Sequence, residues 1–165
     1  MPAFLVLNTD ASKPRENDSS SETAIGVVLR QRRRARDPLK VIDYISEMID
    51  PVPIQEAEYR ALIEGLKLAS AHNPTLASAH NPTDLHVYVD SESVVKQVNA
   101  KARVRANMKP LHAQVLDLID RLEDDRIRVS ISWVPRDINL EADQRAADAF
   151  LELDGRGRRS TAGSK

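Results

Sequence analysis

Cysteine is absent from the 165-residue chain, and no apolar run is longer than a handful of residues. Without cysteine the chain cannot form a disulfide scaffold, a thiolate metal site or a cysteine nucleophile. The short apolar runs exclude a membrane span and a secretory hydrophobic segment, so we expect a cytoplasmic protein with no membrane partner. Hydrophobic residues make up 41% and charged residues 30% of the chain, which excludes a wholly disordered protein.

Net charge is also nearly absent, because 24 basic and 25 acidic residues give a formal value of −1. The charges are nevertheless segregated along the chain. Residues 30–36 carry +5, residues 101–109 carry +4 and residues 155–165 carry +4, so the total of −1 leaves −14 for the rest. A neutral protein with segregated charge can still bind an anionic polymer.

Apolar periodicity predicts one α/β domain over residues 1–152. Strands are expected at 4–10, 23–30, 41–49, 85–90 and 127–133, and helices at 55–71, after the capping residue Ser91, at 110–122 and at 139–151. Three consecutive strands followed by alternating helices and strands predict a mixed sheet with helices on its faces. The remaining segment, 153–165, is basic and contains three glycines, so we expect a disordered tail.

A perfect tandem repeat interrupts this pattern, since LASAHNPT at 68–75 recurs at 76–83. The repeat is too short for a solenoid, and it lies between a helix and a strand, where doubling a loop costs only about 0.6 kcal/mol. We therefore expect a tolerated insertion in a monomer, with a swapped or dimerising extension as the alternative. A metal role for the equivalent residues His72 and His80 is not expected.

Two acids occupy helix faces that are otherwise apolar. Glu58 begins a stripe at helical spacing that continues through Ala61, Leu62, Gly65, Leu66 and Ala69. Asp143 begins a similar stripe with Ala146, Ala147, Phe150 and Leu151. Glu56 lies about 200° around the helix from Glu58, on the other side. A carboxylate on a core-facing stripe is costly unless its charge is compensated.

Two further acids, Asp10 and Asp90, each terminate an apolar strand. Taken singly, either could be a turn or cap residue, and Asp143 could serve only the helix dipole. If the two strands are parallel neighbours, however, all four acids meet at the carboxyl edge of the sheet. The motifs offer no lysine or histidine placed to neutralise the four acids, so hard divalent cations are the natural counter-charge, with Mg²⁺ expected. Two such ions about 4 Å apart suit in-line attack on a phosphodiester.

Four segments resemble type 1 ribonuclease H: TDAS at 9–12, EAEYRALIEGLKLA at 56–69, VYVDSESVVKQVN at 87–99 and WVPRDINLEADQRAADA at 133–149. They are most similar to the branch with AEYxAL and VPRxxNxxADxLA motifs, and the resemblance covers roughly 4–151. It implies the ribonuclease H-like fold, a five-stranded mixed sheet in the order 3-2-1-4-5 with strand 2 antiparallel and flanking helices.

The resemblance also implies an endonuclease that cleaves the RNA strand of RNA/DNA hybrids, with two Mg²⁺ or Mn²⁺ ions per site. Asp10, Glu58, Asp90 and Asp143 would be the catalytic, metal-binding acids. Asp10 would be shared by both ions, with Glu58 and Asp90 on one flank and Asp143 on the other. The products would carry a 5′-phosphate and a 3′-hydroxyl.

Substrate contacts are expected from a second set of residues, namely Ser12, Gln55, Lys101, Arg103, Arg105, Lys109, Arg136 and Asn139. This set departs from the family pattern. Ala11 stands where the family has glycine, Pro53–Gln55 replace its groove-reading asparagines, and Ala102 replaces a tryptophan. The mobile histidine of some members is also absent, so Arg136 or Asn139 is expected to assist instead.

The basic segment at 101–109 follows the helix after Asp90, so phosphate contact is expected there. The arginine run at 32–36 should lie at the opposite sheet edge, about 20 Å from the acids, where a solubility or non-specific role is favoured. Three alternatives remain open. They are a non-catalytic hybrid-binding module, a related two-metal nuclease acting on double-stranded RNA, and an interaction domain without a nucleic-acid role.

Overall fold

The computed structural model describes residues 4–15, 17–18, 20–34, 36–72 and 83–151, together with the backbone of 158–161. The strands are β1 (Phe4–Ser12), β2 (Thr23–Arg32), β3 (Lys40–Ile49), β4 (Thr83–Val89), β5 (Ile127–Trp133) and β6 (Arg158–Thr161). The helices are α1 (Ile54–His72), α2 (Glu92–Val98), α3 (Lys109–Asp124) and α4 (Leu140–Ala149), with short 3₁₀ turns η2 (Ala106–Met108) and η3 (Arg136–Ile138). Among the described helices, none combines the length and the apolar character needed to cross a bilayer.

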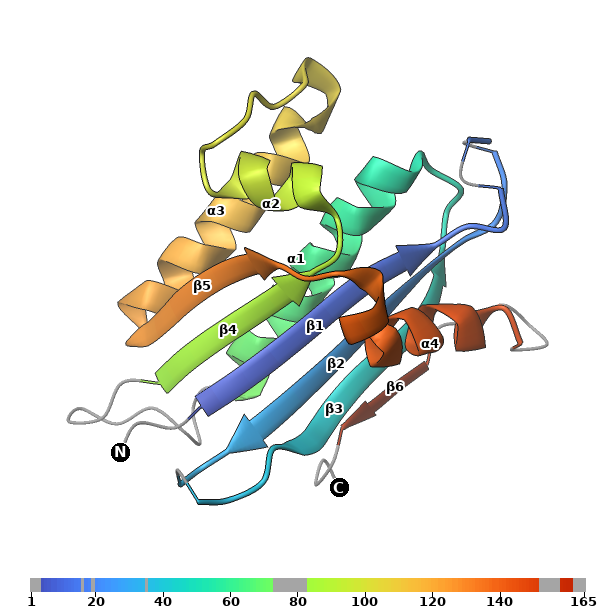
Figure 1. Ribbon diagram of the computed structural model, residues 1–165. Helices are drawn as coiled ribbons and strands as arrows, with labels where there is room; N and C mark the ends of the chain where they lie inside the picture. The colour runs from blue at the N-terminus through green and yellow to red at the C-terminus, as the bar shows by residue number, and fades with distance from the viewer. Residues whose placement is uncertain are drawn as a thin grey trace.

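The strands form one mixed sheet in the order β5-β4-β1-β2-β3-β6 (Figure 1). β1, β4 and β5 are parallel neighbours, whereas β2 pairs antiparallel with both β1 and β3. The predicted order 3-2-1-4-5 with an antiparallel second strand is therefore confirmed. Because β1 and β4 are parallel and adjacent, Asp10 and Asp90 do emerge at the same edge.

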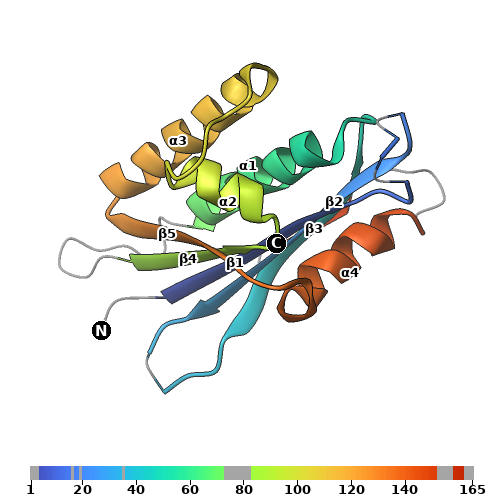
Figure 2. The same cartoon turned by 45° about the horizontal axis from the view of Figure 1, so that its top comes forward.

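Helices cover the sheet unequally, with α1, α2 and α3 on one face and α4 on the other (Figure 2). On β4 the burial alternates strictly, since Leu85, Val87 and Val89 are buried against the three-helix face. β1 lies at the centre of the sheet between the two helical layers, and its residues 5–11 are all buried. The core therefore spans both faces near the carboxyl end of β1, where the acids lie.

Two glycines allow helices to approach the sheet closely. A Cβ atom on Gly26 of β2 would lie 2.1 Å from the Ala142 carbonyl oxygen and 2.4 Å from the Ala146 nitrogen, so α4 rests directly on the strand. On the other face, a Cβ atom on Gly65 of α1 would lie 2.8 Å from the Thr9 methyl group. Such contacts leave room for hydrogen alone, so both helices are tied to the strands that carry or flank Asp10.

The tail differs from its predicted disorder at one place, because Arg158–Thr161 form β6, which pairs antiparallel with β3. The prediction is wrong for these four residues. β3 would otherwise be an edge strand, and its unpaired backbone groups offer a partner to any nearby extended segment. The domain boundary at 152 stays a prediction.

The tandem repeat is described in part. Its first five residues, 68–72, continue α1, which ends one residue beyond the predicted end. His72 closes this helix, and its Nε2 atom lies 3.0 Å from the buried Asp43 carboxylate of β3. Residues 73–82, which include His80 and most of the second copy, lie outside the described residues.

Two helix-level predictions need correction. Ser91 does occupy the N-cap position of α2, but its side chain makes no capping hydrogen bond. In α4 the buried stripe is Ala142, Ala146 and Ala149. The predicted stripe ran one position too late and ended at Leu151, which is 77% exposed. Alanines form the buried face because α4 approaches Gly26 too closely for larger side chains. The larger residues Phe150 and Leu151 therefore indicated the wrong phase for this helix.

Candidate active site

Three of the predicted acids come together from three separate elements. Asp10 lies near the end of β1, Glu58 lies in the first turns of α1, and Asp90 directly follows β4. One carboxylate oxygen from each of them lies within 4.8 Å of the others. Glu58 belongs to the buried face of its helix, as its stripe predicts, whereas Glu56 pairs with Arg60 at 2.9 Å on the outer side.

These carboxylates are buried and poorly satisfied. Asp10 is fully buried, Glu58 is 4% exposed, and the Asp90 side chain is 3% exposed. The Ala11 amide donates a hydrogen bond of 2.9 Å to Asp10 Oδ1, but Oδ2 of Asp10 has no hydrogen-bond partner. Oε2 of Glu58 and Oδ2 of Asp90 are likewise buried without a hydrogen bond. Orphaned buried oxygens are rare in folded proteins, so they call for an explanation.

Burial and mutual repulsion raise the pKa values of two of these groups. The pKa of Asp10 is raised chiefly by its removal from water, and further by the negative charges of Glu58 and Asp90. The pKa of Glu58 is raised by burial and by Asp90, while the positive charge of Arg136 opposes that shift. A bound cation would reverse this balance, because it stabilises all the carboxylates in their ionised form.

The fourth acid, Asp143, lies in the first turn of α4 and is partly buried. It does not belong to the group of three, but its side chain interacts with that of Asp10 and helps to raise the pKa of Asp10. Gly26 explains this position, since it is the register partner of Asp10 on β2 and lies directly beneath α4. A glycine inside a strand was the sequence signal for this close approach, and it was missed.

Asn139 holds the start of α4 against β1. Its Nδ2 atom donates to the Thr9 carbonyl at 2.9 Å, and its Oδ1 atom accepts from Asn8 Nδ2 at 3.0 Å. The Asp143 amide in turn donates to the Asn139 carbonyl at 3.1 Å. Asn139 is only 1% exposed, so its side chain is buried between α4 and β1 and helps to position α4. Its predicted contact with a substrate stays a prediction. Asn8, buried in β1, was not singled out from the sequence.

Arg136 is brought to the acids by the η3 turn between β5 and α4. Its Nε atom lies 3.5 Å from Asp90 Oδ2, while its side chain remains 58% exposed. The guanidinium thus borders the acid cluster and also faces solvent. Arg136 therefore supplies a positive charge beside the acid cluster, for which no lysine or histidine had been expected.

The chemistry of the donor set fits a hard divalent cation. All the ligands are carboxylate oxygens, which Mg²⁺ and Mn²⁺ prefer over nitrogen or sulfur. A bound cation would give a partner to the oxygens of Asp10 and Glu58 that make no hydrogen bond, and a further one to Asp90 Oδ2, which pairs with Arg136 at 3.5 Å. Desolvation alone would make such a cluster unfavourable, and the attraction of a bound cation would offset that penalty.

The remaining predicted contacts lie around this cluster. Ser12, partly buried, ends β1 two residues beyond Asp10 on the same side of the strand. Gln55, in the first turn of α1, donates a hydrogen bond of 3.0 Å to the Ser93 hydroxyl of α2. That contact joins the beginnings of two helices next to Glu58 and Asp90.

The basic segment after α2 forms a shallow cleft of about 700 Å³, to which Arg103, Arg105 and Lys109 all contribute. Lys101 lines an adjacent cleft of about 380 Å³ together with Lys96 and the half-exposed Trp133. The structure therefore groups the four predicted basic residues in two neighbouring clefts beyond the helix that starts next to Asp90.

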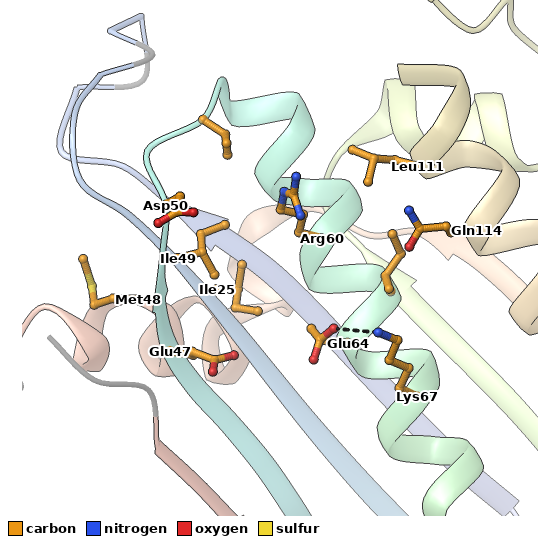
Figure 3. A pocket seen from close by; sticks show the side chains of 12 residues that line it. Ile25, Glu47, Met48, Ile49, Asp50, Arg60, Glu64, Lys67, Leu111 and Gln114 are labelled. Atoms are coloured by element: carbon orange, nitrogen blue, oxygen red, sulfur yellow. Dashed lines mark hydrogen bonds and ion pairs between the residues drawn. The ribbon is translucent and has the colours of Figure 1, made fainter. Parts of the chain in front are cut away.

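A separate cleft of about 640 Å³ lies between β3, α1 and α3 (Figure 3). Ile25 and Ile49 line its floor, and an ion pair of 3.4 Å between Glu64 and Lys67 lies at its side. None of the predicted site residues lines this cleft.

Comparison with protein families gives one match, to the family described as reverse transcriptase-like, over residues 8–149. The chain belongs to this family. The matched region contains all four acids and both helical layers of this ribonuclease H-like domain. No curated protein matches the sequence.

Solved structures support the assignment of the fold. An N-terminal ribonuclease H domain from Mycobacterium tuberculosis is 25% identical, with a TM-score of 0.67 over 88% of this chain and 97% of its own. Ribonuclease H1 from Halobacterium salinarum is 21% identical, with a TM-score of 0.69 over 90% and 98%. LC11 ribonuclease H1, solved in complex with an RNA/DNA hybrid, is 21% identical, with a TM-score of 0.67 over 90% and 99%. The predicted ribonuclease H-like family and fold are confirmed.

Proposed function

We propose that this domain is a metal-dependent ribonuclease H that cleaves the RNA strand of RNA/DNA hybrids. One observation carries the proposal, namely three buried carboxylates that approach one another within 4.8 Å at the carboxyl edge of β1 and β4, each with one oxygen that makes no hydrogen bond. Buried carboxylates are costly unless their charge is paired or coordinates a metal, and this edge is where open α/β sheets bind their ligands. The similar structures titled as ribonucleases H, one of them with a hybrid bound, support the substrate class.

Asp10, Glu58, Asp90 and Asp143 would hold two divalent ions, with Mg²⁺ or Mn²⁺ as the fitting species. When bound, such ions supply a water of lowered pKa and neutralise charge on the departing oxygen. Asp10 is the central ligand of the proposal, because it interacts with all three of the other acids. The expected products carry a 5′-phosphate and a 3′-hydroxyl.

The protein's own cations and amides would position the substrate. Arg136 lies beside Asp90 and half in solvent, so it can contact the phosphate that enters the acid cluster. Gln55, held by Ser93, lies where the minor groove of a hybrid would meet the helix beginnings. Further along, the clefts of the basic segment would hold backbone phosphates through Lys101, Arg103, Arg105 and Lys109.

A substrate panel tests the proposal. End-labelled RNA/DNA hybrid, double-stranded RNA and double-stranded DNA would each be incubated with the protein and Mg²⁺ or Mn²⁺, and the product ends would be mapped. Cleavage of the RNA strand of the hybrid, with 3′-hydroxyl products, is expected. Binding of the hybrid without cleavage would refute the proposal and indicate a non-catalytic hybrid-binding module. Preferential cleavage of double-stranded RNA would show that double-stranded RNA is the substrate. The monomeric state and the cytoplasmic location stay predictions.

A further inference from the structure

One face of the sheet is only half covered. α4 packs over β2 and its neighbours, while the same side of β4 and β5 carries no described helix, and Figure 1 looks onto this bare surface. Along β4 the residues that point this way are partly exposed, among them His86 and Tyr88. Along β5 the corresponding residues Ser130 and Ser132 are exposed. We refer to this surface, formed by β4 and β5 and bordered by Phe4 at the start of β1, as the bare face.

A row of π systems crosses the bare face from strand to strand. The Arg32 guanidinium at the end of β2 lies 4.7 Å above the centre of the Phe4 ring of β1. The Phe4 ring in turn lies 4.7 Å from the His86 ring of β4, with the planes tilted by 31°. His86 Nδ1 lies 3.1 Å from the Ser130 hydroxyl of β5. These contacts hold the His86 ring in a fixed orientation on a surface that no described element covers.

The row ends at the most basic segment of the chain. The segment from Arg32, the last residue of β2, to Lys40, the first residue of β3, contains five basic residues and one acid. Arg33, Arg34, Arg36 and Lys40 are all exposed. Aromatic rings bordered by exposed cations are the combination that binds single-stranded nucleic acid, because the bases stack on the rings and the phosphates meet the cations.

The bare face also leads to the acids. Phe4 and Asp10 lie on the same side of β1, six residues apart, which corresponds to about 20 Å along the strand. His86 and Tyr88 occupy alternate positions of β4 on that side, and Asp90 directly follows the strand two residues after Tyr88. A strand leaving the acid cluster could therefore pass Tyr88 and His86 and reach the arginine turn.

We infer that the bare face binds single-stranded nucleic acid, with bases on His86 and Tyr88 and phosphates on the arginine turn at 32–36. A single strand fits better than a duplex, because its bases are free to stack on protein rings, whereas those of a duplex are already stacked on one another. This binding requires no cleavage, so it is separate from the proposed function. It gives a role to the arginine run, for which the sequence favoured only a solubility or non-specific role.

Fluorescence anisotropy of short labelled single-stranded RNA and DNA, in EDTA and at several KCl concentrations, tests this inference. His86→Ala and Tyr88→Ala should each weaken binding about tenfold with little change in the salt dependence. Arg33→Glu combined with Arg34→Glu should weaken binding at least as much and should reduce the salt slope by about 1–2. Ser130→Asp is the second variant, for use if the ring substitutions perturb folding. It changes an exposed residue, introduces a negative charge beside His86, and should also weaken binding.

Arg121→Glu is the matched control, because Arg121 is exposed on α3 at the other face and pairs with Asp117 at 3.0 Å. It measures the effect of added negative charge far from the bare face, and the affinity for single strands should stay within about twofold of the wild type. Equal losses in this control and in the arginine-turn variant would overturn the inference, as would undiminished binding by the ring and Ser130 variants. A blunt RNA/DNA hybrid is the second probe. Losses on that hybrid as large as those on the single strands would replace the single-strand site with a duplex site.

Discussion

Replacing Asp10 with asparagine should make the metal-free protein more stable while it abolishes cleavage. Asp10 is fully buried, and it interacts with three other carboxylates. Asparagine has the same shape without the charge, and its amide can donate a hydrogen bond to an orphaned oxygen of Glu58 or Asp90. The substitution therefore removes repulsion and satisfies a buried acceptor at the same time.

The sign of the pH dependence follows from the raised pKa of Asp10. An acid whose pKa is higher in the folded state contributes stability below its unfolded pKa of about 4, and this stability is lost as pH rises towards the folded pKa. Each unit of difference corresponds to about 1.4 kcal/mol. We expect the Asp10→Asn variant to gain about 2 kcal/mol at pH 8, or about 4–8 °C in Tm, with almost no gain near pH 4.

Thermal unfolding in EDTA, followed by circular dichroism from pH 4 to pH 9, measures this difference. Glu56→Gln is the matched control, because Glu56 lies on the outer side of α1 and pairs with Arg60. It should shift Tm by no more than about 1–2 °C at any pH. A metal-free Asp10→Asn protein that is no more stable than the wild type, or whose advantage does not grow with pH, would refute the repulsion argument.

The remaining predictions concern the elements around the cluster. Glu58→Gln should reduce the rate of hybrid cleavage by about 10²–10³-fold, whereas Glu56→Gln should stay within about threefold, and equal losses would show that the helix phase is wrong. Gly26→Ala should lower the free energy of unfolding in urea by about 1–3 kcal/mol, because its methyl group would lie 2.1 Å from the Ala142 carbonyl oxygen, and cleavage should fall even under conditions where the variant stays folded. Arg136→Ala should raise the pKa of Glu58 further, so the acid limb of the pH–rate profile should move to higher pH, and an unchanged profile would contradict the proximity of Arg136 to the cluster.

The strands and the acid positions were accessible from the sequence because their signals are local. Apolar runs that end in Asp10 and Asp90 indicate strands, and a carboxylate on the apolar stripe of α1 indicates the phase of Glu58. Parallel pairing of β1 with β4 then required only the order of the elements along the chain. All these inferences depend on periodicity and chain order, which a single sequence contains.

The parts that could not be predicted depend on contacts between distant segments. The phase of α4 follows from the absence of a side chain at Gly26, which lies more than 100 residues away in the sequence. Asn139 is buried because Asn8 and the Thr9 carbonyl of β1 provide its partners. Arg136 reaches Asp90 only because η3 turns back toward β4 after β5. Neither propensity nor spacing specifies such pairings.

The central claim is that Asp10, Glu58 and Asp90 hold the divalent cations that cleave a hybrid. Its most direct test is the initial rate of RNA-strand cleavage as a function of Mg²⁺ concentration, measured for the wild type and for Asp90→Asn on one end-labelled hybrid. The account predicts no cleavage in EDTA, a saturable increase in rate with Mg²⁺ for the wild type, and no cleavage by the variant at any Mg²⁺ concentration. Cleavage by the wild type in EDTA, or a comparable Mg²⁺ response in the variant, would contradict it.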